Sequence, residues 1–249
     1  MDSTVKFCTI PTLVPPQIVA DTLQKVPRTI FQTMETSHVP QRMYEHVSHL
    51  WKMNPDYEYR FYDNQAREKF IQDSYGKESE VAQAFSQINS NVMKAEFWRC
   101  AILYKYGGVY IDIDASFTQP LSSIIRPEDD YLTGIGKRGD PHNWVIICTA
   151  RNPAIGLFVQ DSTRRILQNT PLQSKHWHPL VCMAGPPILD LAFKQHLNQV
   201  GQPLEPGTIY CQGRNYRILE GDLLGGMASF KYDGYKEDLE AMKIAYWKD

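Results

Sequence analysis

The chain has 249 residues, enough for one sizeable domain or for two small ones. Hydrophobic residues make up 43% and charged residues 22%, which is ordinary for a globular protein. The 26 Lys and Arg against 28 Asp and Glu give a formal net charge of −2, so the composition provides no basic surface for nucleic acid.

The five cysteines lie at positions 8, 100, 148, 182 and 211, and none belongs to a C-x-x-C pair. This scatter argues against a disulfide framework and against a zinc site, and it favours a reducing compartment. The first residues lack the basic and apolar regions of a signal peptide, and no apolar run is long enough to cross a bilayer. We therefore expect a cytoplasmic protein without a membrane span.

In chain order, the proline-rich residues 1–26 predict an extended arm that lies over the domain. Residues 26–33 form an apolar-rich stretch that predicts a strand. Pro40 is a favourable residue for a helix start, and the apolar stripe that follows it predicts a helix that ends at Asn54-Pro55-Asp56. Residues 57–62 alternate as a second strand does.

The remaining pattern alternates helices with strands. Helices are predicted at 64–75, 77–88, 90–106, 153–168, 187–199 and 236–246, and strands at 109–111, 131–135, 144–149, 208–211 and 216–219. Such alternation predicts an α/β fold around a mostly parallel sheet, with residues 27–249 forming a single domain.

Two aspartates follow the short strand at 109–111. In an extended backbone, Asp112 and Asp114 would point to the same face, and the apolar neighbours Tyr110, Ile111 and Ile113 indicate a buried strand end. Two buried carboxylates repel each other unless a cation neutralises them, and carboxylate oxygens suit Mg²⁺ or Mn²⁺. The pair therefore predicts a metal site, although Asp-x-Asp alone is a weak signal.

The helix before this strand carries a second polar pair. Glu96 and Arg99 lie on one face of the predicted helix 90–106. This spacing fits two interpretations equally well. The residues could form an ordinary surface ion pair, or they could point toward the metal site, where a guanidinium suits phosphate.

The continuous stretch Ala95–Asp114, AEFWRCAILYKYGGVYIDID, resembles the signature of glycosyltransferase family 32. That family includes initiating α-mannosyltransferases of the yeast Golgi and the glucosylating core of large clostridial toxins. Weaker similarities flank the signature at Pro27–Gln32, at Asn54–Asp63 and at Ala184–Pro187.

The resemblance implies a GT-A fold, which is a Rossmann-like nucleotide-binding α/β/α sandwich that uses Mn²⁺ or Mg²⁺. It implies that Asp114 is the direct metal ligand, that Asp112 binds ribose, sugar or metal, and that Glu96 and Arg99 hold the donor sugar and its phosphate. The expected nucleotide-sugar pocket is completed by Phe31, Gln32, Thr33, Tyr62, Asp63, Tyr110, Ile113 and Asn143.

Two departures from the family pattern affect the site. Glu96 stands where the family usually has Asp, and residues 225–232 lack the histidine that supplies another metal contact in many members. Ser229, a water molecule or the donor's phosphates could replace that histidine. Lys231 could add positive charge at the donor, and the loops at 134–140 and 221–234 are candidates to close over it.

The expected activity is retaining transfer of a hexose from a UDP- or GDP-sugar to a glycan, lipid or protein acceptor. Polysaccharide synthesis is one such role. Two alternatives remain from the residues: a metal phosphohydrolase of the haloacid dehalogenase type, in which the first Asp is the nucleophile, and a non-catalytic protein that binds nucleotide-sugars.

Overall fold

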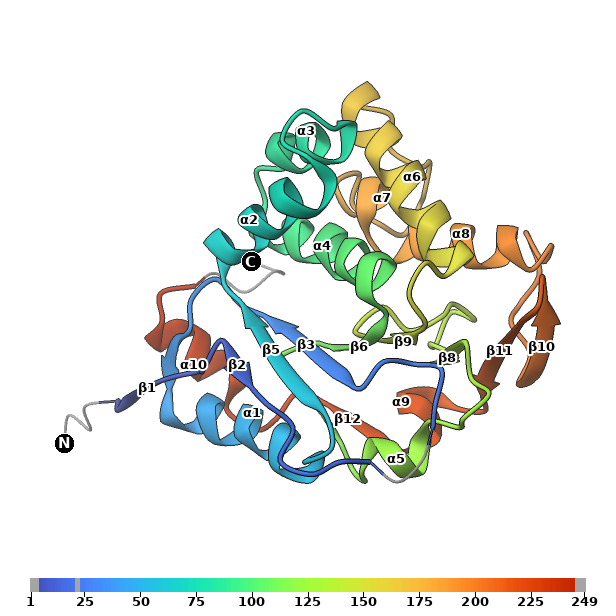
Figure 1. Ribbon diagram of the computed structural model, residues 1–249. Helices are drawn as coiled ribbons and strands as arrows, with labels where there is room; N and C mark the ends of the chain where they lie inside the picture. Colours follow the sequence, from blue (N-terminus) through green and yellow to red (C-terminus); the bar gives the residue numbers. More distant parts are fainter. Residues whose placement is uncertain (1–4, 21–22, 245–249) are drawn as a thin grey trace.

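The computed structural model describes residues 5–20 and 23–244, and it centres on an eight-stranded sheet with the order β10-β11-β8-β9-β6-β3-β5-β2 (Figure 1). The bounds are β2 (Leu13–Val14), β3 (Thr29–Thr33), β5 (Glu58–Tyr62), β6 (Gly108–Ile111), β8 (Tyr131–Gly134), β9 (Val145–Cys148), β10 (Gly207–Cys211) and β11 (Arg214–Leu219). The central strands are buried along their length, as expected for strands covered on both faces.

The directions of the strands confirm a mostly parallel sheet, with antiparallel strands at both edges and one in the middle. Strands β3, β5, β6, β8 and β11 run in one direction, whereas β2, β9 and β10 run in the other. β9 lies antiparallel between β6 and β8, so the reversal falls beside the strand that leads into the acidic residues.

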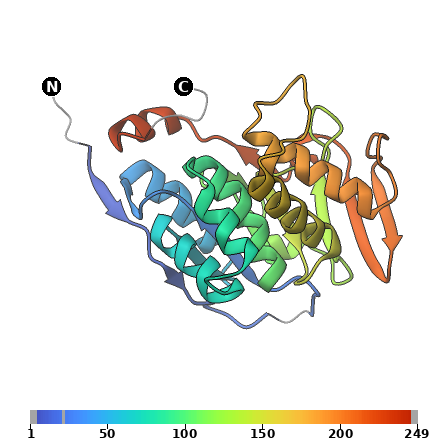
Figure 2. The ribbon, with the colours of Figure 1, turned by 90° about the horizontal axis from the view of Figure 1, so that it is seen from above.

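Helices cover both faces of the sheet and give a three-layer α/β/α sandwich (Figures 1 and 2). One layer contains α2 (Asn64–Tyr75), α3 (Glu80–Gln87), α4 (Asn91–Tyr106), α6 (Pro153–Gln168), α7 (Val181–Ala184) and α8 (Pro186–His196). The other contains α1 (Gln41–Met53), α5 (Leu121–Ile124), α9 (Asp222–Gly225) and α10 (Tyr235–Ala241). Alternate strand residues enter the two cores, as Phe31 and Ile30 of β3 do.

The junction between α4 and β6 places the acidic residues at the edge of the sheet. Ser90 caps the start of α4 by accepting a hydrogen bond from the backbone of Met93. Gly107 ends the helix with a φ of 65°, and a Cβ atom there would lie 2.4 Å from the backbone nitrogen of Ala150. Only glycine fits this position, so the chain passes directly from the buried helix into the buried strand.

Several short elements were not expected from the sequence. β7 (Ala115–Phe117) pairs with β12 (Ala228–Phe230), and β1 (Phe7–Thr9) pairs with β4 (His38–Pro40). Strands of two or three residues are too short to show alternation in a sequence. Helix α3 begins at Glu80 rather than at residue 77, because Ser79 accepts a hydrogen bond from the backbone of Ala82 and fixes the start.

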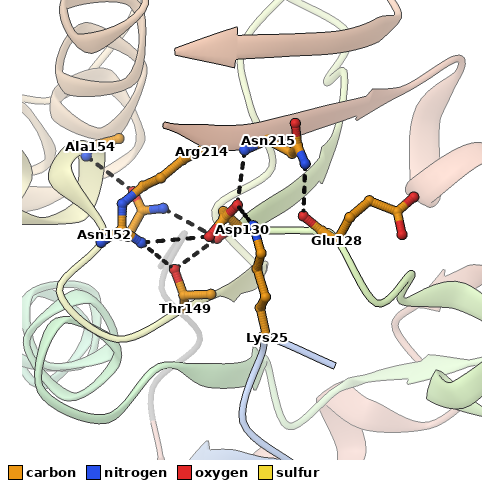
Figure 3. Close-up of polar contacts among 8 residues, drawn as sticks. All are labelled: Lys25, Glu128, Asp130, Thr149, Asn152, Ala154, Arg214 and Asn215. Atoms are coloured by element: carbon orange, nitrogen blue, oxygen red, sulfur yellow. Dashed lines mark hydrogen bonds and ion pairs between the residues drawn. The ribbon is translucent and has the colours of Figure 1, made fainter. Parts of the chain in front are cut away.

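The segment expected as an extended arm runs along the domain, where β2 forms the edge of the sheet beside β5. Its last part is held by the buried carboxylate of Asp130, which lies 2.7 Å from Lys25 Nζ and accepts a hydrogen bond from the backbone of Asn215 (Figure 3). The backbone carbonyl of Asp130 also accepts hydrogen bonds from Thr149 and Asn152. One aspartate thus joins the arm, β9, the start of α6 and β11.

Across residues 5–20 and 23–244, none of the helices combines the length and the apolar character that a bilayer crossing requires. The five cysteines carry free thiols.

Candidate active site

A cavity with about 340 Å³ of open space lies at the carboxyl ends of β3 and β6. Its polar lining comes from α4, β6 and the turn after it, and its aromatic lining includes Trp144, Trp177 and Phe230. Ligands of open α/β sheets bind at such strand ends, so this cavity is the candidate site.

Asp112 and Asp114 lie on a tight turn between β6 and β7, not in the extended strand end that the sequence predicts. The carbonyl of Asp112 accepts hydrogen bonds from the backbone of Ala115 at 3.0 Å and from the Gln32 side chain at 3.2 Å. The backbone N–H of Asp112 donates to Trp144 at 2.8 Å. Both aspartates line the cavity, so the turn, rather than strand alternation, brings them together.

Arg99 connects the acidic residues of the site. Its side chain is 5% exposed, and Nη2 lies 3.1 Å from Asp112 Oδ1 and 3.3 Å from Glu96 Oε1. Nη1 donates to the backbone carbonyl of Asn143 at 2.6 Å. The structure therefore places Glu96 and Arg99 at the site and excludes the alternative of a solvent-exposed ion pair.

Tyr110 and Asn143 fix the two carboxylates that Arg99 contacts. Tyr110 donates from its hydroxyl to Asp112 Oδ1 at 2.6 Å, and the Arg99 guanidinium lies 4.5 Å from the centre of the Tyr110 ring. The Asn143 amide lies 3.2 Å from both carboxylate oxygens of Glu96. Because each group has a partner, the network is ordered before any ligand binds.

Burial changes the acidity of the carboxyl groups in the cavity. It raises the pKa of Glu96 to about 7, with Arg99 acting in the opposite direction. Burial and the neighbouring Asp112 raise the pKa of Asp114 to about 7. The pKa of Asp112 is also raised by burial, against the opposing effects of Arg99 and the Tyr110 hydroxyl. Perturbed carboxyl groups in a cavity are typical of a functional site.

The two aspartates fit a divalent cation. Their oxygens are the hard ligands that Mg²⁺ and Mn²⁺ prefer, and burial together with repulsion from Asp112 raises the pKa of Asp114, a cost that a bound cation would offset. No group of three or more His, Cys, Asp or Glu side chains within the described ranges could hold a metal ion. A cation here needs ligands from water or from a bound phosphate, which Mg²⁺ sites commonly use. Ser229, the expected third ligand, lies on β12 with its hydroxyl 3.5 Å from the carbonyl of Ser116 and does not line the cavity.

The structure separates the other residues of the expected nucleotide-sugar pocket. Thr33 and Ile113 line the cavity. Phe31 is 1% exposed and packs against Tyr62, and Gln32 is fully buried beneath the acidic turn. Tyr62 packs against Phe70 and Trp98, and Asp63 caps the start of α2 by accepting a hydrogen bond from Ala66. None of these four residues lines the cavity.

Sequence reasoning did not include several residues that line the cavity, above all Arg67 and Glu35. One signal for Arg67 was present, because Phe70 and Ile71 follow it at spacings of three and four and place it on the buried face of α2. The aromatic wall had no local signal, because Trp144, Trp177 and Phe230 are far apart in the chain and meet only in the fold.

The fold resembles that of a known class of enzymes. The structure of "PaToxG Glycosyltransferase" superposes with a TM-score of 0.56 and 18% identity over 70% of each chain. At this identity the likeness concerns the fold, and the chain has the GT-A fold of glycosyltransferase domains.

Residues 40–131 match the family model described as "Glycosyltransferase sugar-binding region containing DXD motif", and this range includes Glu96, Arg99, Asp112 and Asp114. Over these residues the chain is similar to this DXD glycosyltransferase family.

Curated relatives include two proteins of Schizosaccharomyces pombe. "Inositol phosphoceramide mannosyltransferase 1" is 23% identical over 198 residues, which cover 78% of this chain and 60% of the relative. "Initiation-specific alpha-1,6-mannosyltransferase" is 30% identical over 223 residues, which cover 80% of this chain and 55% of the relative. The chain thus spans a little over half the length of these two proteins.

Proposed function

We propose that this protein is a retaining hexosyltransferase that uses a UDP- or GDP-linked sugar and a divalent cation, Mn²⁺ or Mg²⁺. The observation that supports it most is the joining of Arg99, Asp112 and Asp114 at one end of a cavity of about 340 Å³. A guanidinium beside a cation-binding acidic pair matches the charges of a sugar diphosphate.

The names of the relatives support mannose as the transferred hexose, because both are mannosyltransferases. Mannose is a proposal for this chain. Glu96 would discriminate between hexoses, since Asn143 holds its carboxylate inside the cavity where it can accept hydrogen bonds from sugar hydroxyls.

In the proposed reaction the bond between sugar C1 and the phosphate oxygen breaks, and its electron pair stays on the nucleoside diphosphate. An acceptor hydroxyl oxygen bonds to C1 with retained configuration, and its proton leaves to the departing phosphate. A cation held by Asp112 and Asp114 would supply Lewis-acid stabilisation of the diphosphate. Arg99 orients the donor, and Lys231, whose charge acts on both aspartates, adds to the positive potential.

A second cavity of about 450 Å³ supports a place for the acceptor. It shares Trp177 and Pro186 with the first cavity, and the Arg138 guanidinium lies 4.4 Å from the centre of the Trp177 ring. Asp190 and Lys194 pair at 2.8 Å on another wall. A stacked aromatic ring with balanced charges suits a hydroxyl-rich acceptor such as a glycan or the sugar-like headgroup of a lipid.

The two alternatives differ in how they stand against these findings. The GT-A fold and the position of the DXD pair within the matched region favour sugar transfer over the phosphohydrolase alternative. The alternative of a protein that binds nucleotide-sugars without turnover is distinguished from a transferase by measuring release of nucleoside diphosphate. The cytoplasmic location and the closure of the loops at 134–140 and 221–234 stay predictions.

A panel of UDP- and GDP-sugars, with Mn²⁺, with Mg²⁺ or with EDTA, tests the proposal. A ligand of the folded state raises the unfolding temperature by mass action, so the correct donor is expected to do so only with the cation. Release of nucleoside diphosphate in the presence of simple mannosides then measures turnover. Binding without release would favour the non-catalytic alternative, and no binding of any donor would contradict the proposal.

A further inference from the structure

Arg67 is a buried arginine whose hydrogen-bonding capacity is mostly unused. It lies on α2, is 1% exposed, and lines the same cavity as Arg99 and Asp112. One terminal nitrogen, Nη2, donates to the side-chain oxygen of Asn64. Nε and Nη1 have no hydrogen-bond partner in the described part of the chain. A buried guanidinium normally has most of its donors satisfied.

The charged groups around Arg67 attract it without bonding to it. Glu35, which follows β3, and Asp63, which precedes α2, act on it electrostatically, and Arg99 on α4 acts in the repulsive sense. In the described part of the chain, the Arg67 guanidinium forms no ion pair with the carboxylate of Glu35 or with that of Asp63. The surrounding protein therefore holds the Arg67 guanidinium in position but leaves its Nε and Nη1 donors unused.

Such an arrangement destabilises the ligand-free protein. Burying a charged group or an N–H donor without a partner is costly, and an apolar side chain of similar shape would fill this space at lower cost. Arg99, the other buried arginine of the cavity, forms two ion pairs and a hydrogen bond to a backbone carbonyl, and of its three nitrogens only Nε lacks a partner among the described residues. The contrast indicates that the donors of Arg67 serve a partner other than the side chains around it.

We infer that Arg67 is a donor-binding residue whose Nε and Nη1 bind oxygen atoms of the nucleotide-sugar. The inference rests on the proposed function and adds a residue to its site. Nε–H and Nη1–H point from different edges of the guanidinium, so each can donate a charge-assisted hydrogen bond to a separate oxygen atom of a phosphate, a ribose or a base. A phosphate and a base both offer oxygen acceptors, and binding of nucleoside diphosphates and of nucleosides distinguishes between them.

The experiment compares Arg67→Met with the wild-type chain. Methionine fills a similar volume without charge, and Lys69→Met, on the exposed face of the same helix, is the matched control. Thermal unfolding is measured without ligand, and affinities for UDP, GDP, uridine and guanosine are measured with Mn²⁺ at a temperature where all variants are folded. Arg67→Lys, which keeps the charge but loses the Nε and Nη1 donors, is a second variant in case Arg67→Met does not fold.

We expect Arg67→Met to bind the nucleoside diphosphate about tenfold to a hundredfold more weakly, the effect of losing charge-assisted hydrogen bonds. Its ligand-free unfolding temperature is expected to stay the same or rise, because an unpaired buried charge is removed. A loss confined to diphosphates assigns Arg67 to the phosphates, and an equal loss with nucleosides assigns it to the base or ribose. Lys69→Met is expected to leave the affinities for nucleoside diphosphates and for nucleosides unchanged.

Two results would overturn the inference. If the wild-type chain binds a nucleoside diphosphate and Arg67→Met, or Arg67→Lys in its place, binds within about twofold of it, Arg67 has a structural role only. If the wild-type chain binds no nucleoside diphosphate, the proposed function fails, and the inference fails with it. The wild-type measurement therefore distinguishes the two failures.

Discussion

Tyr110 donates a hydrogen bond to Asp112 across 2.6 Å, although the two residues are only two positions apart and the second lies on a turn. The tyrosine hydroxyl holds one carboxylate oxygen, Oδ1, which is also the oxygen that Arg99 contacts. This arrangement restrains the orientation of the Asp112 carboxylate, so that its second oxygen is available to a cation or to a sugar hydroxyl.

Tyr110→Phe is therefore expected to lower kcat/KM about threefold to tenfold, which corresponds to one net hydrogen bond. Phenylalanine keeps the ring beneath Arg99, so the unfolding temperature is expected to change little. Steady-state kinetics and thermal unfolding check both expectations. An unchanged kcat/KM would show that Arg99 alone orients Asp112.

Asp114→Asn is expected to lower kcat by about 10²-fold, comparable to the loss of one strong electrostatic contact in an active site. The neutral amide cannot offset the charge of a cation, so the rise in unfolding temperature with Mn²⁺ should also disappear. Asp73→Asn, at a carboxylate that is 57% exposed on α2, is the control and should retain both properties. Full activity of Asp114→Asn in excess Mn²⁺ would contradict the assignment.

Asp130→Ala is expected to lower the free energy of unfolding by about 2–4 kcal/mol, because it removes the acceptor of the Asn215 backbone and the ion-pair partner of Arg214 and Lys25 (Figure 3). Lys25→Met removes only a partly exposed cation and should cost less than about 1 kcal/mol. Chemical denaturation measures both, and kcat is expected to stay constant because the cluster lies outside the cavity lining. Equal costs would mean that Lys25 is the main partner.

His46 is expected to make stability depend on pH. Its Nε2 lies 3.1 Å from the carbonyl of Ala115, and its ring packs 4.4 Å from that of Tyr232. Burial lowers the pKa of His46 below its ordinary value of 6.5. The unfolded chain therefore binds a proton at a pH where the folded chain does not, and stability falls as the pH drops below about 6.5.

His46→Gln keeps a hydrogen-bond donor and removes this titration. Its free energy of unfolding is expected to decrease less than that of the wild-type chain between pH 7.5 and 5.5. The exposed residue His178 provides the control variant, His178→Gln, which should follow the wild-type curve. Parallel curves for the wild-type chain and His46→Gln would contradict the prediction.

Long periodic segments were predictable because their pattern is local. The predicted helices at 64–75 and 153–168 match α2 and α6, because Asp63 and Asn152 cap their starts and apolar residues recur on one face. The pairs β1–β4 and β7–β12 were not predictable, because each strand has at most three residues and its partner lies far away in the chain.

The candidate site divides in the same way. The residues Glu96, Arg99, Asp112 and Asp114 lie within one contiguous stretch, so the sequence by itself determined the charged groups and the family that they indicate. Only the tertiary structure decided that a turn presents the aspartates, that Gln32 supports this turn from below and that Arg67 enters the cavity with two unused donors. The physical reason is that covalent spacing specifies neighbours along one element, whereas burial and hydrogen-bond partners depend on elements that meet only when the sheet and its helices assemble.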